Sequence, residues 1–228
     1  MNYNEFPREE WLKNILLKIP AGSRILDAGA GELDKKKYCG HLQYVSQDFA
    51  KYDGSGDGHG LQTTVWDQTR LDIVSDITAI PVADHSFDAA MCIEVLEHLP
   101  DPIAAIRELA RIVRPGGGLI LTAPFCSITH FAPFHYSTGF NRYWYEKHLS
   151  DHGFAIQELQ PNGNFFHFLL QEMSRIDFVT DKYRGSKMNL MQRISRRIIK
   201  KFLLKQALRD SYSSELLCFG YHVFAVKK

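Results

Sequence analysis

Short apolar runs alternate with helical patterns along most of the chain. The runs occupy residues 24–28, 43–47, 72–75, 87–93 and 118–123, and two further strands are expected at 154–159 and 216–226. Strands that alternate with helices are typical of parallel sheets, because parallel neighbours need a long crossover connection. The sequence therefore predicts an α/β fold with a doubly wound sheet covered by helices on both faces.

Helical segments are expected before and within this pattern. Pro7 is followed by two acidic residues, which suits a helix start, and an N-terminal helix is predicted within residues 1–20. The residues between the last two strands also have helical character, which predicts a helical insertion at 163–213. We expect residues 1–228 to form a single domain that carries this insertion.

The N-terminal residues and the cysteines bear on the cellular compartment in which the protein is expected. The N-terminal residues lack the uninterrupted apolar core of a signal peptide, and no segment approaches the length of a membrane span. The four cysteines show no CxxC pairing, which favours free thiols over a disulfide framework or a zinc site. These features predict a cytoplasmic protein.

Basic residues are concentrated in the insertion. Residues 183–209 hold nine of the 27 Lys and Arg residues and no acid, which leaves 18 basic against 26 acidic residues elsewhere. Within 188–209, helical spacing places Met191, Ile194, Ile198, Ile199 and Phe202 on one side and Arg193, Arg196, Arg197 and Lys200 on the other. We expect a docked surface helix with its charged face in solvent. Contact with a peripheral membrane surface or an anionic partner is the alternative.

A glycine turn, ILDAGAGELD, follows the first strand. A dinucleotide fingerprint requires a third glycine, but Asp34 stands at that position. Glu32 and Asp34 at the mouth of the next helix would repel bound phosphates. The turn therefore suits a ligand that has no phosphates and that carries positive charge.

Acidic side chains end three further strands. Asp48 ends the second strand, where a carboxylate can accept hydrogen bonds from both hydroxyls of a ribose. Asp76 follows the third strand with the apolar Ile77 beside it, and Glu94 follows the fourth. Each acid alone could simply cap a helix. Together with the glycine turn they predict a ligand site at one edge of the sheet.

These motifs, in this order, resemble the class I S-adenosylmethionine-dependent methyltransferases of the small-molecule, type 11-like kind. The resemblance rests on ILDAGAGE, YVSQD, VSDITAIPVADHSFDAAMCIEVLEHLPDP and RIVRPGGGLILTAP. It is strong over residues 24–123 and looser as far as 159. The resemblance implies a Rossmann-like sheet of seven strands with an antiparallel last strand, and S-adenosylmethionine as the cofactor.

The resemblance also implies which residues hold the cofactor. The glycine turn would line its methionine part, Asp48 would hold the ribose, and Asp76 with Ile77 would hold the adenine. The predicted cofactor-binding residues are Asp27, Gly29, Ala30, Gly31, Asp48, Phe49, Asp76, Ile77 and Glu94. An acidic pocket with helix-mouth N–H groups complements the sulfonium, the ammonium and the carboxylate of this cofactor.

An aromatic-rich segment after the fifth strand is the expected substrate wall. It contains His130, His135 and Tyr136, which are the predicted catalytic residues, with His135 or His130 as the base for an acceptor hydroxyl. The alternative is that these histidines only bond the backbone. The motif [DN]PP[YF] of amine methyltransferases is replaced by IEVLEH, and the acidic body opposes a nucleic acid. The expected acceptor is an hydroxyl or carboxyl on a small molecule, sugar or lipid.

The sequence leaves three alternatives to a metal-independent methyltransferase. The segment DGSGDGHG begins like a calcium loop, but Thr64 stands where a bidentate acid is needed, so no metal site is predicted. A nicotinamide oxidoreductase on a similar sheet is one alternative function. A protein that keeps the fold without turnover, and works through its basic helix, is another. The sequence does not indicate the oligomeric state.

Overall fold

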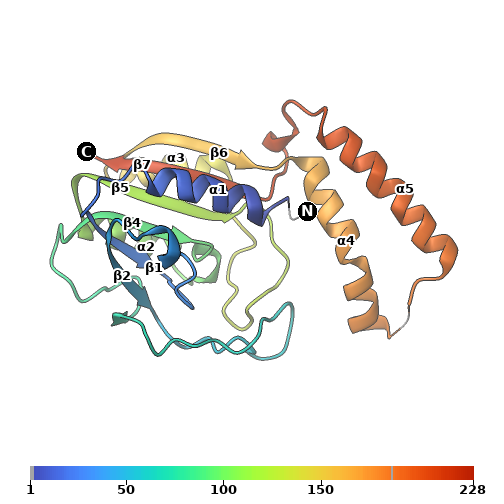
Figure 1. Cartoon of the computed structure of the whole chain (residues 1–228), viewed down its shortest axis with the longest axis horizontal. Helices are drawn as coiled ribbons and strands as arrows, with labels where there is room; N and C mark the ends of the chain where they lie inside the picture. The colour runs from blue at the N-terminus through green and yellow to red at the C-terminus, as the bar shows by residue number, and fades with distance from the viewer. Residues whose placement is uncertain (1–2, 186) are drawn as a thin grey trace. The chain divides into compact units, whose positions relative to one another are not determined.

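The computed structural model describes residues 3–185 and 187–228, which form two compact units. One unit holds Arg8–Gln160 and Gly220–Lys228; the other holds the chain up to Pro7 and Pro161–Phe219. The first contains most of a seven-stranded sheet in the order β3-β2-β1-β4-β5-β7-β6 (Figure 1). Its strands are β1 (Arg24–Ala28), β2 (Gln43–Asp48), β3 (Ile73–Val74), β4 (Phe87–Ile93), β5 (Val113–Pro124), β6 (Phe154–Asn162) and β7 (Gly220–Lys227).

The pairing of the strands confirms the predicted fold class. Strands β3, β2, β1, β4 and β5 are parallel to one another, and β7 runs antiparallel to β5. The chain order reverses on the two sides of β1, between β2 and β4. In open α/β sheets, ligands bind outside the carboxyl ends of the strands at such a switch point.

Helices cover the sheet of the first unit. Helix α1 (Glu5–Leu16) buries Trp11, Leu12, Ile15 and Leu16 in a core with residues of β1, β4 and β5. Helix α2 (Pro102–Ile112) begins where the Asp101 side chain accepts a hydrogen bond from the Ala104 N–H, and Pro stands at its first position. Helix α3 (Arg142–Asp151) begins in the same way at Asn141.

The second unit is built around the helices of the insertion. Helix α4 (Phe165–Arg184) and helix α5 (Leu190–Ala207) lie side by side and contact each other (Figure 1). At the ends of the insertion, the Phe219 N–H donates to the carbonyl of Asn162 at 2.9 Å. None of the described helices is long and apolar enough to cross a membrane.

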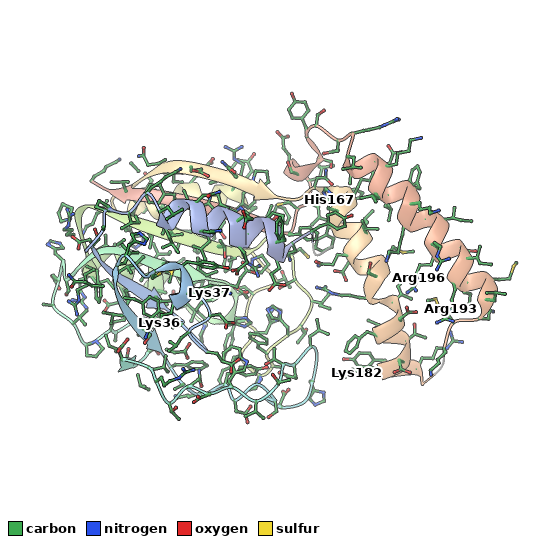
Figure 2. The ribbon with its side chains drawn as sticks, in the orientation of Figure 1. Lys36, Lys37, His167, Lys182, Arg193 and Arg196 are labelled. Atoms are coloured by element: carbon green, nitrogen blue, oxygen red, sulfur yellow. The ribbon has the colours of Figure 1, made fainter. Side chains whose placement is uncertain are left out.

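Helix α5 is oriented in the reverse of the expected way. Its basic side chains line a groove against α4, and Arg196 pairs with Asp177 on α4 at 2.7 Å; Figure 2 shows Arg193 and Arg196 on the side that faces α4. The apolar side chains Met191, Ile194, Ile198, Ile199 and Phe202 are exposed. The reason lies at the end of the helix, where Leu203 and Ala207 are buried. They share the helical side of the basic residues and therefore fix the rotation of α5.

Candidate functional site

A cavity of about 370 Å³ lies in the first unit at the carboxyl ends of the parallel strands. Its wall combines acidic residues at strand ends with aromatic side chains from the connecting loops. The lining residues include Gly29, Gln47, Asp48, Phe49, Tyr52, Trp66, Asp76, Ile77, Glu94, His98, Phe131, Phe134 and Tyr136. Six of the predicted cofactor-binding residues are among them: Gly29, Asp48, Phe49, Asp76, Ile77 and Glu94.

The glycine turn is held to β2 by backbone hydrogen bonds. The N–H groups of Gly29 and Ala30 donate to the carbonyl of Gln47, and the N–H of Gly31 donates to Asp48 Oδ2 at 2.9 Å. Gly29 has a φ of +79°, and a Cβ there would lie 2.4 Å from Val95 Cγ2. Only glycine fits this position, because both the backbone angle and the space exclude a side chain. Ala30 and Gly31 support the cavity without lining it.

Asp48 and Asp76 present carboxylates to the cavity in different ways. Asp48 is 5% exposed, and its Oδ1 also accepts from the Ala50 N–H at 2.9 Å. Asp76 accepts from the N–H and hydroxyl of Thr78, and these bonds lower the pKa of its carboxyl. Gln47 Oε1 is buried on the same wall, without a hydrogen-bond partner among the described residues. A ligand with O–H or N–H donors would satisfy that oxygen.

Asp27 is buried and does not line the cavity. It is 2% exposed, and its Oδ2 accepts a hydrogen bond from the Tyr44 hydroxyl at 2.6 Å. Burial raises the pKa of Asp27 to about 7, and the hydrogen bond from Tyr44 only partly opposes that rise. The structure therefore places this predicted residue against Tyr44 and away from the cavity wall.

Glu94 is held from both sides at the end of β4. Its Oε1 accepts from the Thr122 hydroxyl at 2.8 Å, and its Oε2 pairs with Arg8 Nη1 at 2.9 Å. Its φ is +57°, a strained backbone conformation for a residue with a side chain. Such strain is typical of functional sites that the surrounding structure holds rigidly.

A histidine cluster borders the cavity next to Glu97. Burial raises the pKa of Glu97, which is 1% exposed, while the ring of His130 opposes the rise. Burial also lowers the pKa of His98 to about 3. Burial alone would lower the pKa of His130, but Glu97 raises it; burial and His130 lower the pKa of His135.

The predicted catalytic residues lie together but have different surroundings. Tyr136 lines the cavity and is 52% exposed. His130 and His135 are not among the lining residues. Their ring centroids are 4.8 Å apart, and His135 Nε2 lies 3.1 Å from Ser127 Oγ. Sequence reasoning missed Glu97 and His98. The signal that could have found them is the run EVLEH, which has acids and a histidine directly after a buried strand.

The glycine-rich segment 53–66 forms part of the wall. Asp53 Oδ1 accepts hydrogen bonds from Ser55 and Gly56 of its own segment. A Cβ at Gly56 would lie 2.0 Å from the carbonyl oxygen of Ala132. The glycines therefore let this segment pack directly against the aromatic-rich loop after β5, and Trp66 reaches the cavity.

The comparisons with known proteins identify the family. Residues 3–166 match the family described as "Methyltransferase domain". The chain belongs to this family. Its cofactor is S-adenosylmethionine, which agrees with the acidic wall of the cavity. The methyltransferase domain is also 39% identical, over 105 residues, to a ubiquinone biosynthesis O-methyltransferase of Xanthomonas oryzae pv. oryzae. That alignment spans 45% of this chain and 43% of the relative, so the chain spans less than half the length of that relative.

Solved structures confirm the fold of the methyltransferase domain. A SAM-dependent methyltransferase from Archaeoglobus fulgidus superposes with a TM-score of 0.58 at 14% identity, over 96% of this chain and 92% of that one. Phosphoethanolamine N-methyltransferase 2 from Haemonchus contortus, in complex with S-adenosyl-L-methionine, gives a TM-score of 0.56 at 18% identity. The match covers 98% of this chain and 52% of that one.

Proposed function

We propose that the chain transfers a methyl group from S-adenosylmethionine to an hydroxyl of a small organic acceptor. The observation that carries the proposal is the cavity, where carboxylates at strand ends meet an aromatic wall and a histidine cluster. The likeness to an O-methyltransferase over the central part of the chain supports an oxygen acceptor. The aromatic wall favours a ring-containing or lipid-like acceptor over a sugar.

The residues of the cavity divide into those that hold the cofactor and those that face the acceptor. Asp48 suits the ribose hydroxyls, and Asp76 with Ile77 suits the adenine. The cofactor supplies an activated methyl group on a sulfonium, and the leaving group is neutral. The protein must chiefly align the acceptor oxygen with that methyl group, and alignment of this kind can supply ~7 to 11 kcal/mol of the barrier.

His135 is our proposed proton acceptor. The Ser127 hydroxyl donates its proton to the carbonyl of Thr138, so Ser127 Oγ must accept from His135 Nε2. The lone pair of His135 is then on Nδ1, where it can receive a proton from an acceptor hydroxyl. Tyr136, on the cavity wall one residue further, would orient the same hydroxyl.

The test is methyl transfer to a panel of phenols, carboxylic acids and amines, followed by mass spectrometry. We expect a gain of one methyl group on phenols only. His135→Gln should lower kcat by ~10²-fold or more and leave cofactor affinity unchanged, because it removes only the proton acceptor. His85→Asn, which removes an exposed histidine outside the cavity wall, is the matched control. Equal losses of kcat and of cofactor affinity would contradict the role of His135, and products from amines alone would contradict the acceptor class.

We also propose that residues 188–209 contact an anionic membrane surface. The apolar stripe of Met191, Ile194, Ile198 and Phe202 is exposed. By helical spacing the exposed Lys205 lies on the same side of α5, and Lys201, which also lines the groove against α4, lies at its edge. An apolar face flanked by basic residues suits the boundary between acyl chains and anionic headgroups. Membrane contact would also bring the domain close to lipid-like acceptors.

The cysteines support a reducing compartment, for which we propose the cytoplasm. All four are free thiols, and Cys39, Cys92 and Cys218 are buried. Cys126 is exposed, so it would oxidise readily outside a reducing environment.

A further inference from the structure

Three potential ligand side chains converge beside the cavity. Glu97 and His98 lie on η2 (Leu96–His98), directly after β4, and His130 comes from the loop after β5. The Nε2 atoms of His98 and His130 lie 3.6 Å and 3.7 Å from Glu97 Oε1. One ligand atom of each residue lies within 4.8 Å of the others, and His98 also lines the cavity.

The backbone fixes both histidines with a lone pair toward Glu97. His98 Nδ1 bonds the carbonyl of Phe134, and His130 Nδ1 bonds the carbonyl of Ile128 at 2.9 Å. A carbonyl can only accept, so each Nδ1 carries the proton. In a neutral ring each Nε2 is then an acceptor. Metal-binding histidines are oriented by the same kind of bond from the second nitrogen to a carbonyl.

When both rings are neutral, Glu97 completes a set of three hydrogen-bond acceptors that face one another. Neither of its carboxylate oxygens, nor His98 Nε2, has a hydrogen-bond partner among the residues that the structure describes, although these atoms are buried. Burial of an unpartnered carboxylate is strongly unfavourable. The separations to the two histidines exceed hydrogen-bond length, so a single proton cannot join all three groups.

A cation in the middle would satisfy all three groups at once. Metal–nitrogen and metal–oxygen bonds of about 2.1 Å at tetrahedral angles place neighbouring ligand atoms about 3.4 Å apart. This is close to the 3.6 Å and 3.7 Å that separate Glu97 Oε1 from the two histidine nitrogens, and the third pair lies within 4.8 Å. Two imidazoles and one carboxylate are ligands that suit zinc and its first-row neighbours. Calcium and magnesium prefer oxygen ligands.

We propose that Glu97, His98 and His130 bind a divalent first-row transition metal ion, with its open positions toward the cavity. The loops hold this set rigidly. The N–H groups of Tyr136 and Ser137 donate to the backbone carbonyl of Glu97, and a bridge to Leu61 fixes the backbone of His130. The ligands therefore need little rearrangement to bind.

The role of the ion rests on the proposed function. Bound at an open position, the acceptor hydroxyl would lose its proton to a base or to water at a lower pH than in solution. Its oxygen forms the new bond to the methyl carbon as the carbon–sulfur bond breaks, and the electron pair of that bond stays on sulfur. No oxidant or reductant takes part.

Cobalt binding to the full chain, after dialysis against a chelator, tests the site without any acceptor. We expect one Co²⁺ per chain by calorimetry, with visible absorption typical of nitrogen and oxygen ligands. Glu97→Gln and His130→Gln should each weaken binding by at least ~10-fold, because each removes one ligand. His85→Asn should bind cobalt as the wild type does, because His85 is exposed and does not line the cavity. Unfolding curves and cofactor titrations check that every variant is folded.

Two outcomes separate this inference from the proposed function. Stoichiometric cobalt binding without methyl transfer would support the site and contradict the function. Methyl transfer at an unchanged rate in chelator-treated protein that binds no cobalt would overturn the site and support the function. If Glu97→Gln folds poorly, His98→Gln takes its place in the test, and we expect the cobalt absorption band to be lost in that variant. An unaltered band in both histidine variants overturns the inference.

Discussion

Asp27 shows how a single buried acid couples stability to pH. Its pKa is raised from 3.8 in a model peptide to about 7 by burial, with Tyr44 bonded to one oxygen and Asp48 and Lys35 as the charged neighbours. Between these two pKa values the folded state binds a proton that the unfolded state has released. The stabilisation is therefore complete below about pH 3.8 and is lost as the pH rises through about 7.

Replacement of Asp27 with Asn should remove this pH dependence. Asn keeps the shape and an oxygen that accepts from Tyr44, but it cannot ionise. Between pH 5 and pH 7, the free energy of unfolding of the wild type should fall by about 2 kcal/mol relative to the variant. Urea unfolding at several pH values measures the difference. Parallel curves for the two proteins would show that Asp27 is ionised throughout this range.

At the level of elements, the glycine-rich segment 53–66 should be sensitive to its contact with the loop after β5. Gly56→Ala places a methyl group against the carbonyl of Ala132, which should lower the free energy of unfolding by about 1 to 3 kcal/mol. Gly58→Ala is the matched control, because Gly58 also has a positive φ but nothing lies within 4 Å of its Cβ position. Urea unfolding measures the free energy of unfolding of both variants. Equal losses of stability would mean that the contact with Ala132 is unimportant.

Helix α5 gives a second prediction at this level. The full chain should sediment with vesicles that contain phosphatidylserine and bind weakly to phosphatidylcholine alone. Ile194→Ser/Ile198→Ser should reduce binding by at least ~10-fold, since both side chains would insert into the bilayer. Val65→Ser removes a comparable exposed side chain outside α5 and should have no effect. Unchanged binding of the double variant would leave the apolar stripe to a protein partner.

The element boundaries show what sequence can predict. Strands β1, β2 and β4 begin and end within one residue of the expected positions, because central parallel strands are continuous apolar runs between turns. The acids at the strand ends were also predicted to lie at one edge. The rotation of α5 was not predicted, because helical periodicity defines two faces of a helix but does not indicate which face packs against a neighbouring element.

The proximity of His130 to Glu97 could not be predicted from the sequence either. It depends on the bridge between Leu61 and His130 and on backbone carbonyls that orient both rings. Neither the bridge nor the orientation of these carbonyls corresponds to a recognisable pattern in the amino-acid sequence. Contacts between two loops depend on chain paths that no local periodicity records.

At the scale of the whole molecule, the cavity lies within one of the two units. All of its lining residues belong to Arg8–Gln160. S-adenosylmethionine at 100 times its Kd should therefore stabilise that unit by ~2.7 kcal/mol, whereas NAD should not. Differential scanning calorimetry measures the shift, and Asp48→Ala should abolish most of it. Stabilisation by NAD in place of S-adenosylmethionine would favour an oxidoreductase.

The hydrogen bond between Phe219 and Asn162 brings the two ends of the insertion together, so the insertion could be removed without separating β6 from β7. Because its ends meet at neighbouring strands, the segment between them can be exchanged for a tight turn, and β6 and β7 then become an ordinary hairpin. Closing a shorter loop there even lowers the entropy lost on folding. The insertion can therefore be exchanged at this point of the chain without any change to the residues that line the cavity, all of which lie between Arg8 and Gln160.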